Sequence, residues 1–394
     1  MSRKPKILFV ISYDAYAEIA SRLAPVFVAK GASVRHIFLK RDSGRDIVIN
    51  GNLVKALQKT GDITYASDVN LVACVKRAAC DVVFFCCSGR RIWTVIQEFG
   101  QDGIERPLFV SCFAGVTLYR QEVGFSHRIA SDIILFNSKK NVEDYKHHCK
   151  RLGASHENAF LLGFPSLTGV ATRSDVSLPP RRVLFVDQNI VPHSKADRIA
   201  LARFLIAYAQ AWPDRKIIVQ CRNQNGHNSA HPSKYHLPEL LLSSTTDRMV
   251  PPNLAIKYDT PQEALDWCDL CLGFASTLLI NAITRGISTA IISDFGWRAS
   301  FGNRLFLGSG LERCFDDIRN DVLPTRPNPE WLEANVSRPE AALDHLFEIF
   351  TRAADSPRRS VVNARFAEKY GSNYNIARRM RFFLKKVRSW FGGG

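Results

Sequence analysis

Short, almost fully apolar runs recur along most of this chain, and helical patterns separate them. In the first half, the runs occupy residues 6–11, 33–39, 81–87, 108–113 and 132–137. A strand without polar alternation must be covered on both faces, which is typical of parallel sheets flanked by helices. The alternation therefore predicts an α/β domain, doubly wound around a parallel sheet, over residues 1–163.

The second half repeats the alternation. Its apolar runs occupy residues 182–187, 216–220, 253–257, 270–274 and 289–293. A polar stretch at 164–181 is typical of a linker, so we predict a second doubly wound domain over residues 182–355. Two Rossmann-like domains would then face a cleft, because ligands of such sheets bind at the carboxyl ends of the strands.

The C-terminal part has the composition of helices. We expect one helix over residues 331–352 and separate C-terminal helices over 356–394, ending in a basic-aromatic tail at 376–391. The tail is typical of a helix that lies on an anionic membrane surface, and equally of a packing helix with basic stems on its surface.

Basic residues outnumber acidic ones, with 53 Lys and Arg against 37 Asp and Glu, a net charge of +16. Such a charge favours an anionic partner. The apolar run after the N-terminal basic residues is too short for a signal peptide, and no run reaches the ~18 apolar residues of a membrane span. We therefore expect a cytoplasmic protein, or one held peripherally on the inner face of the membrane. No motif of a specific nucleic-acid binder is present.

Two segments of the second half are candidates for binding a phosphate. Gly273 directly follows the strand segment CDLCL, and Ser276 and Thr277 come next at the start of a helix, where free N–H groups favour an anion. Gln188, Asn189 and His193 lie in a polar loop between another strand and the next helix. Both loops follow strands, so we expect them to line the cleft.

A long polar loop at 220–236 carries Arg222, Lys234 and three histidines. The pair His231-Pro232 fixes the local backbone and can direct an imidazole at a nucleotide. Zinc needs a closed set of regularly spaced ligands, and the Asn, Gly, Ser and Pro residues here disfavour a helix. We therefore predict no metal site in this loop. We also expect no bound cofactor apart from a nucleotide that is part of the ligand.

The first half offers candidates for an acceptor site. Asp14 follows the first strand and is a candidate general base for an acceptor hydroxyl, although aspartate is also an ordinary turn residue. The flanking Tyr13 and Tyr16, and Ser88, Arg90 and Arg91 after the third strand, would line the same cleft and bind an anionic acceptor.

Several motifs of other enzyme classes are missing. The sequence has no G-x-x-x-x-G-K-[ST] loop, no strand-initial G-x-G-x-x-G and no G-x-S-x-G elbow. These absences disfavour P-loop NTPases, standard dinucleotide dehydrogenases and α/β-hydrolases.

Five segments together resemble glycosyltransferases of the GT-B class. They are ISYDAY, LLGFPSL, LFVDQNIVPHSKADR, IVQCRNQNGHNSAHPSKYH and GFASTLLINAITRGISTAIISDFG, which span most of residues 6–296. The chain is similar to uncharacterised bacterial glycosyltransferases and to the CMP-sugar-dependent capsule, sialic-acid and Kdo transferases. His231-Pro232 resembles the His-Pro motif that holds CMP in bacterial sialyltransferases.

The resemblance implies a metal-independent transfer of a sugar from a nucleotide-sugar donor, with a CMP-activated sialic-acid- or Kdo-like sugar as the expected donor. His231 would contact the CMP phosphate or ribose, and the acceptor would be an anionic glycan or a lipid-linked saccharide of surface polysaccharide synthesis. The final helices would cross back to the N-terminal domain, as in this fold generally.

One departure leaves alternatives open. The sialyltransferases pair the His-Pro motif with an acidic-acidic-Gly motif, which this sequence lacks. Either Asp14 takes that role from another loop, or the donor is not a CMP-sugar. A UDP- or GDP-hexose transferase or epimerase of the same fold, and a non-catalytic anion-binding protein, are the alternatives.

Overall fold

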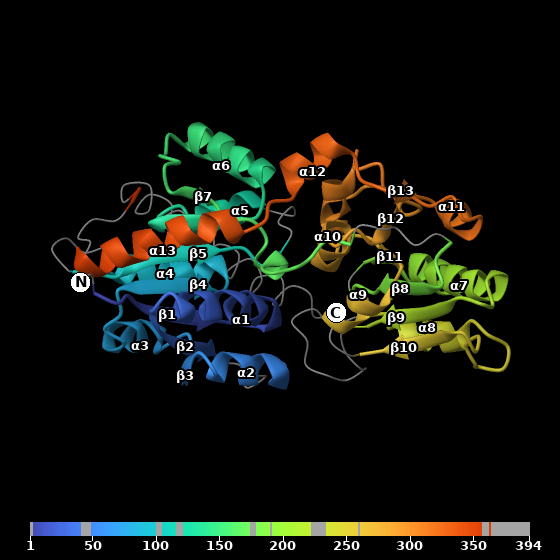
Figure 1. Ribbon diagram of the computed structural model, residues 1–394, viewed down its shortest axis with the longest axis horizontal. Coiled ribbons are helices and arrows are strands. Elements are labelled where there is room, and N and C mark those ends of the chain that lie inside the picture. Colours follow the sequence, from blue (N-terminus) through green and yellow to red (C-terminus); the bar gives the residue numbers. More distant parts are fainter. Residues whose placement is uncertain are drawn as a thin grey trace, which may run out of the picture.

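Two parallel sheets organise the chain, as Figure 1 shows. The computed structural model describes residues 3–40, 49–99, 105–115, 121–173, 179–189, 191–221, 234–258, 261–356 and 362–363. Helices lie on both faces of each sheet, so the predicted pair of doubly wound domains is confirmed.

The N-terminal sheet has the strand order β3-β2-β1-β4-β5-β6-β7, and every described pair is parallel. Its strands are β1 (Lys6–Ile11), β2 (Ser33–Leu39), β3 (Gly61–Ala66), β4 (Val82–Cys86), β5 (Leu108–Cys112), β6 (Ile133–Phe136) and β7 (Ala159–Leu161). Its helices are α1 (Asp14–Ala29), α2 (Gly51–Gln58), α3 (Leu71–Arg77), α4 (Gly89–Phe99), α5 (Gln121–Ser126) and α6 (Lys139–Leu152).

The C-terminal sheet has the order β10-β9-β8-β11-β12-β13 and is also parallel. Its strands are β8 (Arg182–Val186), β9 (Lys216–Gln220), β10 (Leu254–Lys257), β11 (Leu270–Gly273), β12 (Ser288–Ile292) and β13 (Glu312–Arg313). The helices that follow β8 onward are α7 (Lys195–Ala211), α8 (Leu237–Ser243), α9 (Pro261–Trp267), α10 (Thr277–Thr284) and α11 (Phe315–Arg319), with 3-10 turns η2 (Ala299–Phe301) and η3 (Asn303–Phe306).

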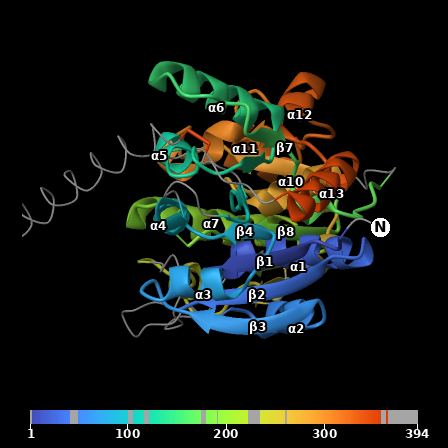
Figure 2. The same ribbon diagram turned by 90° about the vertical axis from the view of Figure 1, so that its left-hand side faces the viewer.

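The side chains of the N-terminal strands alternate between two apolar layers. Phe9 and Ile11 of β1 pack with α1, whereas Leu8 and Val10 pack with α3 and α4. Figure 2 shows α1 on one side of this sheet and α3 and α4 on the other. The central strands are apolar throughout because both of their faces are buried.

Some elements differ from those expected. The strand β3 was not predicted, because it lies at the sheet edge and its exposed positions are polar, as in GDITYA.

The single helix expected over residues 331–352 is instead two helices, which is a correction. α12 (Pro329–Asn335) ends before an extended segment, and α13 (Glu340–Asp355) begins after Pro339. Proline disfavours a helical conformation in the residue before it, which separates the two helices. α13 packs on the N-terminal sheet, so the chain crosses back before residue 340 rather than at the expected boundary of 355 (Figure 1).

The polar linker is packed along α10. Within the linker, η1 (Pro165–Leu167) carries Ser166, whose hydroxyl donates to Asn281 Oδ1 at 2.8 Å. The hydroxyl of Thr172 donates to the carbonyl oxygen of Thr284 at 3.0 Å. Since η1 also contacts α1, the linker connects α10 to the N-terminal domain.

The return of α13 generates a prediction about stability. Phe350 is fully buried, and its ring centroid lies 5.2 Å from that of Phe27 in α1. Removing a buried phenyl ring leaves a cavity, so Phe350→Ala should lower the free energy of unfolding by about 3–5 kcal/mol. Urea unfolding would measure this change. Glu348→Ala, on the exposed face of the same helix, is the control, and an equal effect of both variants would contradict the packing role.

Candidate active site

The carboxyl ends of the two sheets meet between the domains. Gly115, which follows β5, lies against Thr277 at the start of α10, and a Cβ atom at Gly115 would lie only 2.3 Å from Thr277 Oγ1. Gly115 has a φ of +72°, and Asn137 Nδ2 donates to its carbonyl oxygen at 2.7 Å. Only glycine permits both this conformation and this approach. The loops at the carboxyl ends of the two sheets are therefore in contact, as the parallel sheets predict.

In the C-terminal sheet, the loops that follow β8 and β11 are bonded to each other. The side-chain oxygen Oε1 of Gln188 accepts the backbone N–H of Ala275 at 2.9 Å. β8 and β11 are neighbours at the point where the strand order reverses, which is where doubly wound sheets bind ligands. The two loops predicted to bind the donor therefore form one surface.

A buried ion pair positions the loop that follows β8. Arg198 Nη2 lies 3.0 Å from Asp187 Oδ1, and both side chains are buried. Arg198 Nη1 donates to the carbonyl oxygens of Gln188 and Val191 at 3.0 and 3.1 Å. Burial raises the pKa of Asp187, and the charge of Arg198 opposes this rise. Arg198 thus fixes the backbone that carries Gln188.

The start of α10 is the predicted phosphate site. The hydroxyl of Ser276 accepts the N–H of Leu278 at 3.2 Å and so caps the helix. Ser276 and Thr277 are both half-buried. Gly273 ends β11, where a Cβ atom would come within 3.2 Å of Leu279 Cδ2, so the glycine allows the helix to pack close to the strand.

The remaining described donor candidates lie in the same loop. Asn189 is half-buried beside Gln188, and His193 is exposed, with its ring edge-on to Phe301 at a centroid distance of 4.8 Å.

In the N-terminal domain, Asp14 is exposed at the first turn of α1, and its Oδ1 accepts the N–H of Asn50 at 2.8 Å. Tyr13 is half-buried, with its ring edge-on to that of Tyr16 at 4.8 Å. Tyr16 is buried, and its hydroxyl accepts a hydrogen bond from Arg128 at 3.0 Å, so it lies beneath the surface rather than on it. Burial raises the pKa of Tyr16 well above its usual range.

The predicted basic residues lie at the start of α4. Ser88 and Arg90 are exposed, whereas Arg91 is half-buried and pairs with Asp68. Arg90 therefore keeps a solvent-facing charge at the carboxyl end of β4, and the charge of Arg91 is partly neutralised.

Sequence reasoning missed Arg128 and His127, which lie beneath these residues. Both are buried, and burial, followed by the charges of Arg128 and Arg90, lowers the pKa of His127 to about 4. The segment SHRIASD that contains them has no motif. The fold brings Arg128 against the carboxyl ends of β4 and β5, where it binds the carbonyl oxygens of Cys87 and Cys112. Asp187 and Arg198 were also missed, although a charged residue directly after an apolar strand is a usable signal.

Three predicted residues, Arg222, His231 and Pro232, and the tail at 376–391 lie outside the described residues. Across the described ranges, no group of three or more His, Cys, Asp and Glu side chains could hold a metal ion. Likewise, no described helix is long and apolar enough to span a membrane.

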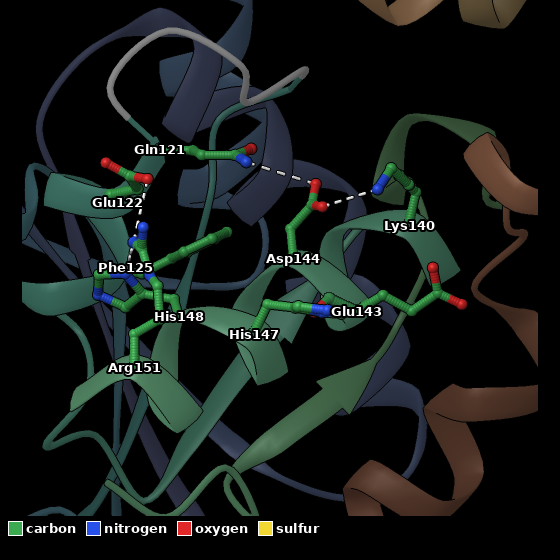
Figure 3. Close-up of a pocket in the computed structure, with 9 residues that line it drawn as sticks. All are labelled: Gln121, Glu122, Phe125, Lys140, Glu143, Asp144, His147, His148 and Arg151. Carbon is green, nitrogen blue, oxygen red and sulfur yellow. Dashed lines mark hydrogen bonds and ion pairs between the residues drawn. The ribbon is translucent and has the colours of Figure 1, made fainter. Parts of the chain in front are cut away.

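A hollow of about 390 Å³ lies between α5 and α6, outside the predicted site (Figure 3). Charged side chains line it, but they pair with one another: Arg151 with Glu122, and Lys140 with Asp144. His148 lies beside them, and its ring nitrogen Nε2 is 2.9 Å from the hydroxyl of Ser126.

The ion pair below the donor loop generates a second prediction. Arg198→Met leaves Asp187 buried without its partner, which should cost about 3–5 kcal/mol of unfolding free energy. The double variant Arg198→Met/Asp187→Asn should lose much less unfolding free energy than the sum of the losses in the two single variants, because it leaves no unpaired buried charge. A double-mutant cycle in urea measures the coupling, and additive effects would show that the pair does not act as a unit.

Comparison with known families identifies the chain. The family described as "Putative glycosyltransferase (DUF6716)" matches residues 7–349, which is most of the sequence. A search of curated protein sequences finds no significant match.

Solved structures with the same fold bind nucleotides or nucleotide sugars. UDP-GlcNAc 2-epimerase from Neisseria meningitidis, bound to UDP-GlcNAc, has a TM-score of 0.55 at 10% identity, over 88% of this chain and 100% of that chain. MnaA of S. aureus with UDP has a TM-score of 0.52 at 9% identity, over 97% of both chains. Arabidopsis thaliana UGT89C1 complexed with UDP-L-rhamnose has a TM-score of 0.50 at 11% identity, over 89% of this chain and 95% of that chain.

These similarities confirm the predicted fold and the predicted enzyme class, whereas the CMP-sugar donor stays a prediction. The chain belongs to the DUF6716 family of glycosyltransferases and has the GT-B fold.

Proposed function

We propose that this glycosyltransferase binds a nucleotide-sugar donor on its C-terminal domain, with the phosphate at the start of α10. The supporting observation is the position of that helix terminus. It lies at the reversal point of the sheet, beside the loop that carries Gln188, and it faces Gly115 of the other domain. The positive end of a helix, with its N–H groups, stabilises a phosphate.

The same terminus can stabilise the leaving group. As the bond between sugar and phosphate breaks, negative charge grows on the nucleotide, and the N–H groups of the helix start and the hydroxyl of Thr277 would stabilise that charge. Such preorganised donors lower the barrier without a divalent ion. The close approach of Gly115 to Thr277 would exclude water, which otherwise hydrolyses the donor.

Asp14 is our proposed general base. It is exposed at the carboxyl end of β1, on the acceptor side of the cleft, and its bond from Asn50 uses Oδ1. The other carboxylate oxygen would accept the proton of an acceptor hydroxyl while the hydroxyl oxygen of the acceptor attacks the sugar.

For the donor we propose a CMP-activated sugar acid, which rests on the His231-Pro232 pair. A UDP-sugar is the second candidate, because the solved structures of the same fold hold UDP-GlcNAc, UDP and UDP-L-rhamnose. The acceptor would be a saccharide or glycoconjugate. Attachment of the tail at 376–391 to an anionic membrane is a further part of the proposal.

A thermal-shift panel with CMP, CDP, UDP, GDP and ADP, in the presence of EDTA, tests the donor site. A nucleotide at 100 times its dissociation constant should stabilise the protein by about 2.7 kcal/mol. Thr277→Val should reduce that shift, because it removes the hydroxyl at the helix start and keeps the side-chain shape. Thr245→Val is the control, since Thr245 is also a half-buried threonine of the C-terminal domain.

The outcomes separate the candidates. A shift specific to CMP, lost in His231→Ala, would support the sugar-acid donor. A shift specific to UDP or GDP would exclude CMP and keep the transferase mechanism. No shift with any nucleotide, or equal shifts in Thr277→Val and the wild type, would contradict a phosphate site at α10.

A further inference from the structure

Four arginines are buried in the described part of the chain, and three of them contact an aspartate. The pairs are Arg106–Asp132, Arg198–Asp187 and Arg215–Asp321, at 2.6, 3.0 and 2.7 Å. The fourth is Arg128, which is 3% exposed and forms no ion pair with any described carboxylate. A buried charge is costly unless an opposite charge accompanies it.

Neutral groups satisfy the hydrogen bonds of Arg128 but not its charge. Nε donates to the carbonyl oxygen of Cys112, Nη1 to that of Gly124, and Nη2 to that of Cys87, each at 3.1 Å. Nη2 also donates to the hydroxyl of Tyr16, and the guanidinium carbon lies 4.2 Å from the ring centroid of Phe113. These dipoles orient the guanidinium, and no described carboxylate compensates its positive charge.

The guanidinium lies at the ligand-binding edge of the N-terminal sheet. Cys87 follows β4 and Cys112 ends β5, and β4 adjoins β1 at the reversal point of the strand order. Gly89, the first residue of α4, allows the start of this helix to approach the guanidinium of Arg128, because a Cβ atom at Gly89 would lie only 2.9 Å from Arg128 Nη1. The positive end of an 11-residue helix therefore meets a buried cation.

Ser12 is an independent sign of a ligand at this place. It is 3% exposed, and its hydroxyl has no hydrogen-bond partner among the described residues. Its N–H donates to the carbonyl oxygen of Cys86 at 3.1 Å, so it lies beside the end of β4. Alternation along β1 places Ser12 on the face of Val10, which α4 covers. A buried hydroxyl without a partner requires an explanation, and at the carboxyl end of a strand a bound group supplies one.

Arg90 adds a cation on the solvent side. It is exposed in the first turn of α4, and its charge acts on His127, as does that of Arg128. Both arginines therefore lie near His127, one exposed to solvent and one buried.

We propose that this place binds an anionic group of the acceptor, a carboxylate or a phosphate, through Arg128, Arg90, the hydroxyl of Ser12 and the start of α4. The identification of the ligand as the acceptor rests on the proposed function, whereas the anion site itself does not. The acceptor would then be an acidic saccharide or a sugar phosphate rather than a neutral sugar.

Titration calorimetry on the full chain tests the site, with inorganic phosphate, glucuronate, glucose 6-phosphate and glucose as probes at constant ionic strength. We expect the three anions to bind and glucose not to bind. Arg90→Gln and Ser12→Ala should each weaken anion binding at least tenfold. Ser12→Ala should leave the melting temperature without ligand unchanged, because its hydroxyl has no bond to lose within the described protein. Arg128→Met would also break the bonds to three loops, so it does not carry the test.

Two further variants, Arg77→Gln and Thr277→Val, show where on the protein the anion binds. Arg77→Gln removes an exposed arginine of the same domain and should leave anion binding unchanged. Anion binding that is lost in Thr277→Val but kept in Arg90→Gln and Ser12→Ala would place the anion at α10 and overturn the inference. So would anion affinities that no variant changes. The relative affinities for glucuronate and glucose 6-phosphate distinguish a carboxylate from a phosphate.

The nucleotide panel keeps the two proposals separate. Nucleotide binding together with anion affinities that do not depend on Arg90 and Ser12 would overturn the anion site and keep the proposed donor site. Anion binding that depends on Arg90 and Ser12, in a protein that binds no nucleotide, would support the anion site and overturn its assignment to an acceptor.

Discussion

Parallel pairing of the central strands is the constraint on which the rest of the structure depends. When every strand runs in the same direction, each loop that follows a strand lies at one edge of its sheet. The loops after β1 and β4 in one domain, and after β8 and β11 in the other, are therefore neighbours although they are far apart in sequence. Gly115 and Thr277 join these two edges across the cleft.

Buried arginines position the loops at both edges. Arg198 binds the carbonyl oxygens of the loop after β8, and Arg128 binds those at the ends of β4 and β5. The two differ in their counter-charge, because Asp187 accompanies Arg198 and no described carboxylate accompanies Arg128. The charge of Arg198 is thus balanced by a described residue of the protein, and in our proposal a ligand balances that of Arg128.

Much of the fold was predictable from sequence, because a strand covered on both faces is recognisable as a continuous apolar run. The bounds of β1, β2 and β9 were predicted to the residue. The edge strand β3 was not, since polar residues at its exposed positions interrupt the apolar run. The site was predictable only in part. Ser276 and Thr277 follow a strand and open a helix, which is a local pattern, whereas Arg128 has no local pattern at all.

The sequence by itself determined the two parallel sheets, the linker between them and the loops that end their strands, because periodicity and local capping residues are properties of neighbouring positions. Only the tertiary structure decided that the chain returns to the first domain as early as α13, that the Tyr16 hydroxyl is buried against Arg128, and that Gly115 lies against Thr277. These contacts join residues far apart in the chain, and their energies depend on which groups share a buried environment. Such burial follows from the packing of whole elements and is not encoded in any short segment.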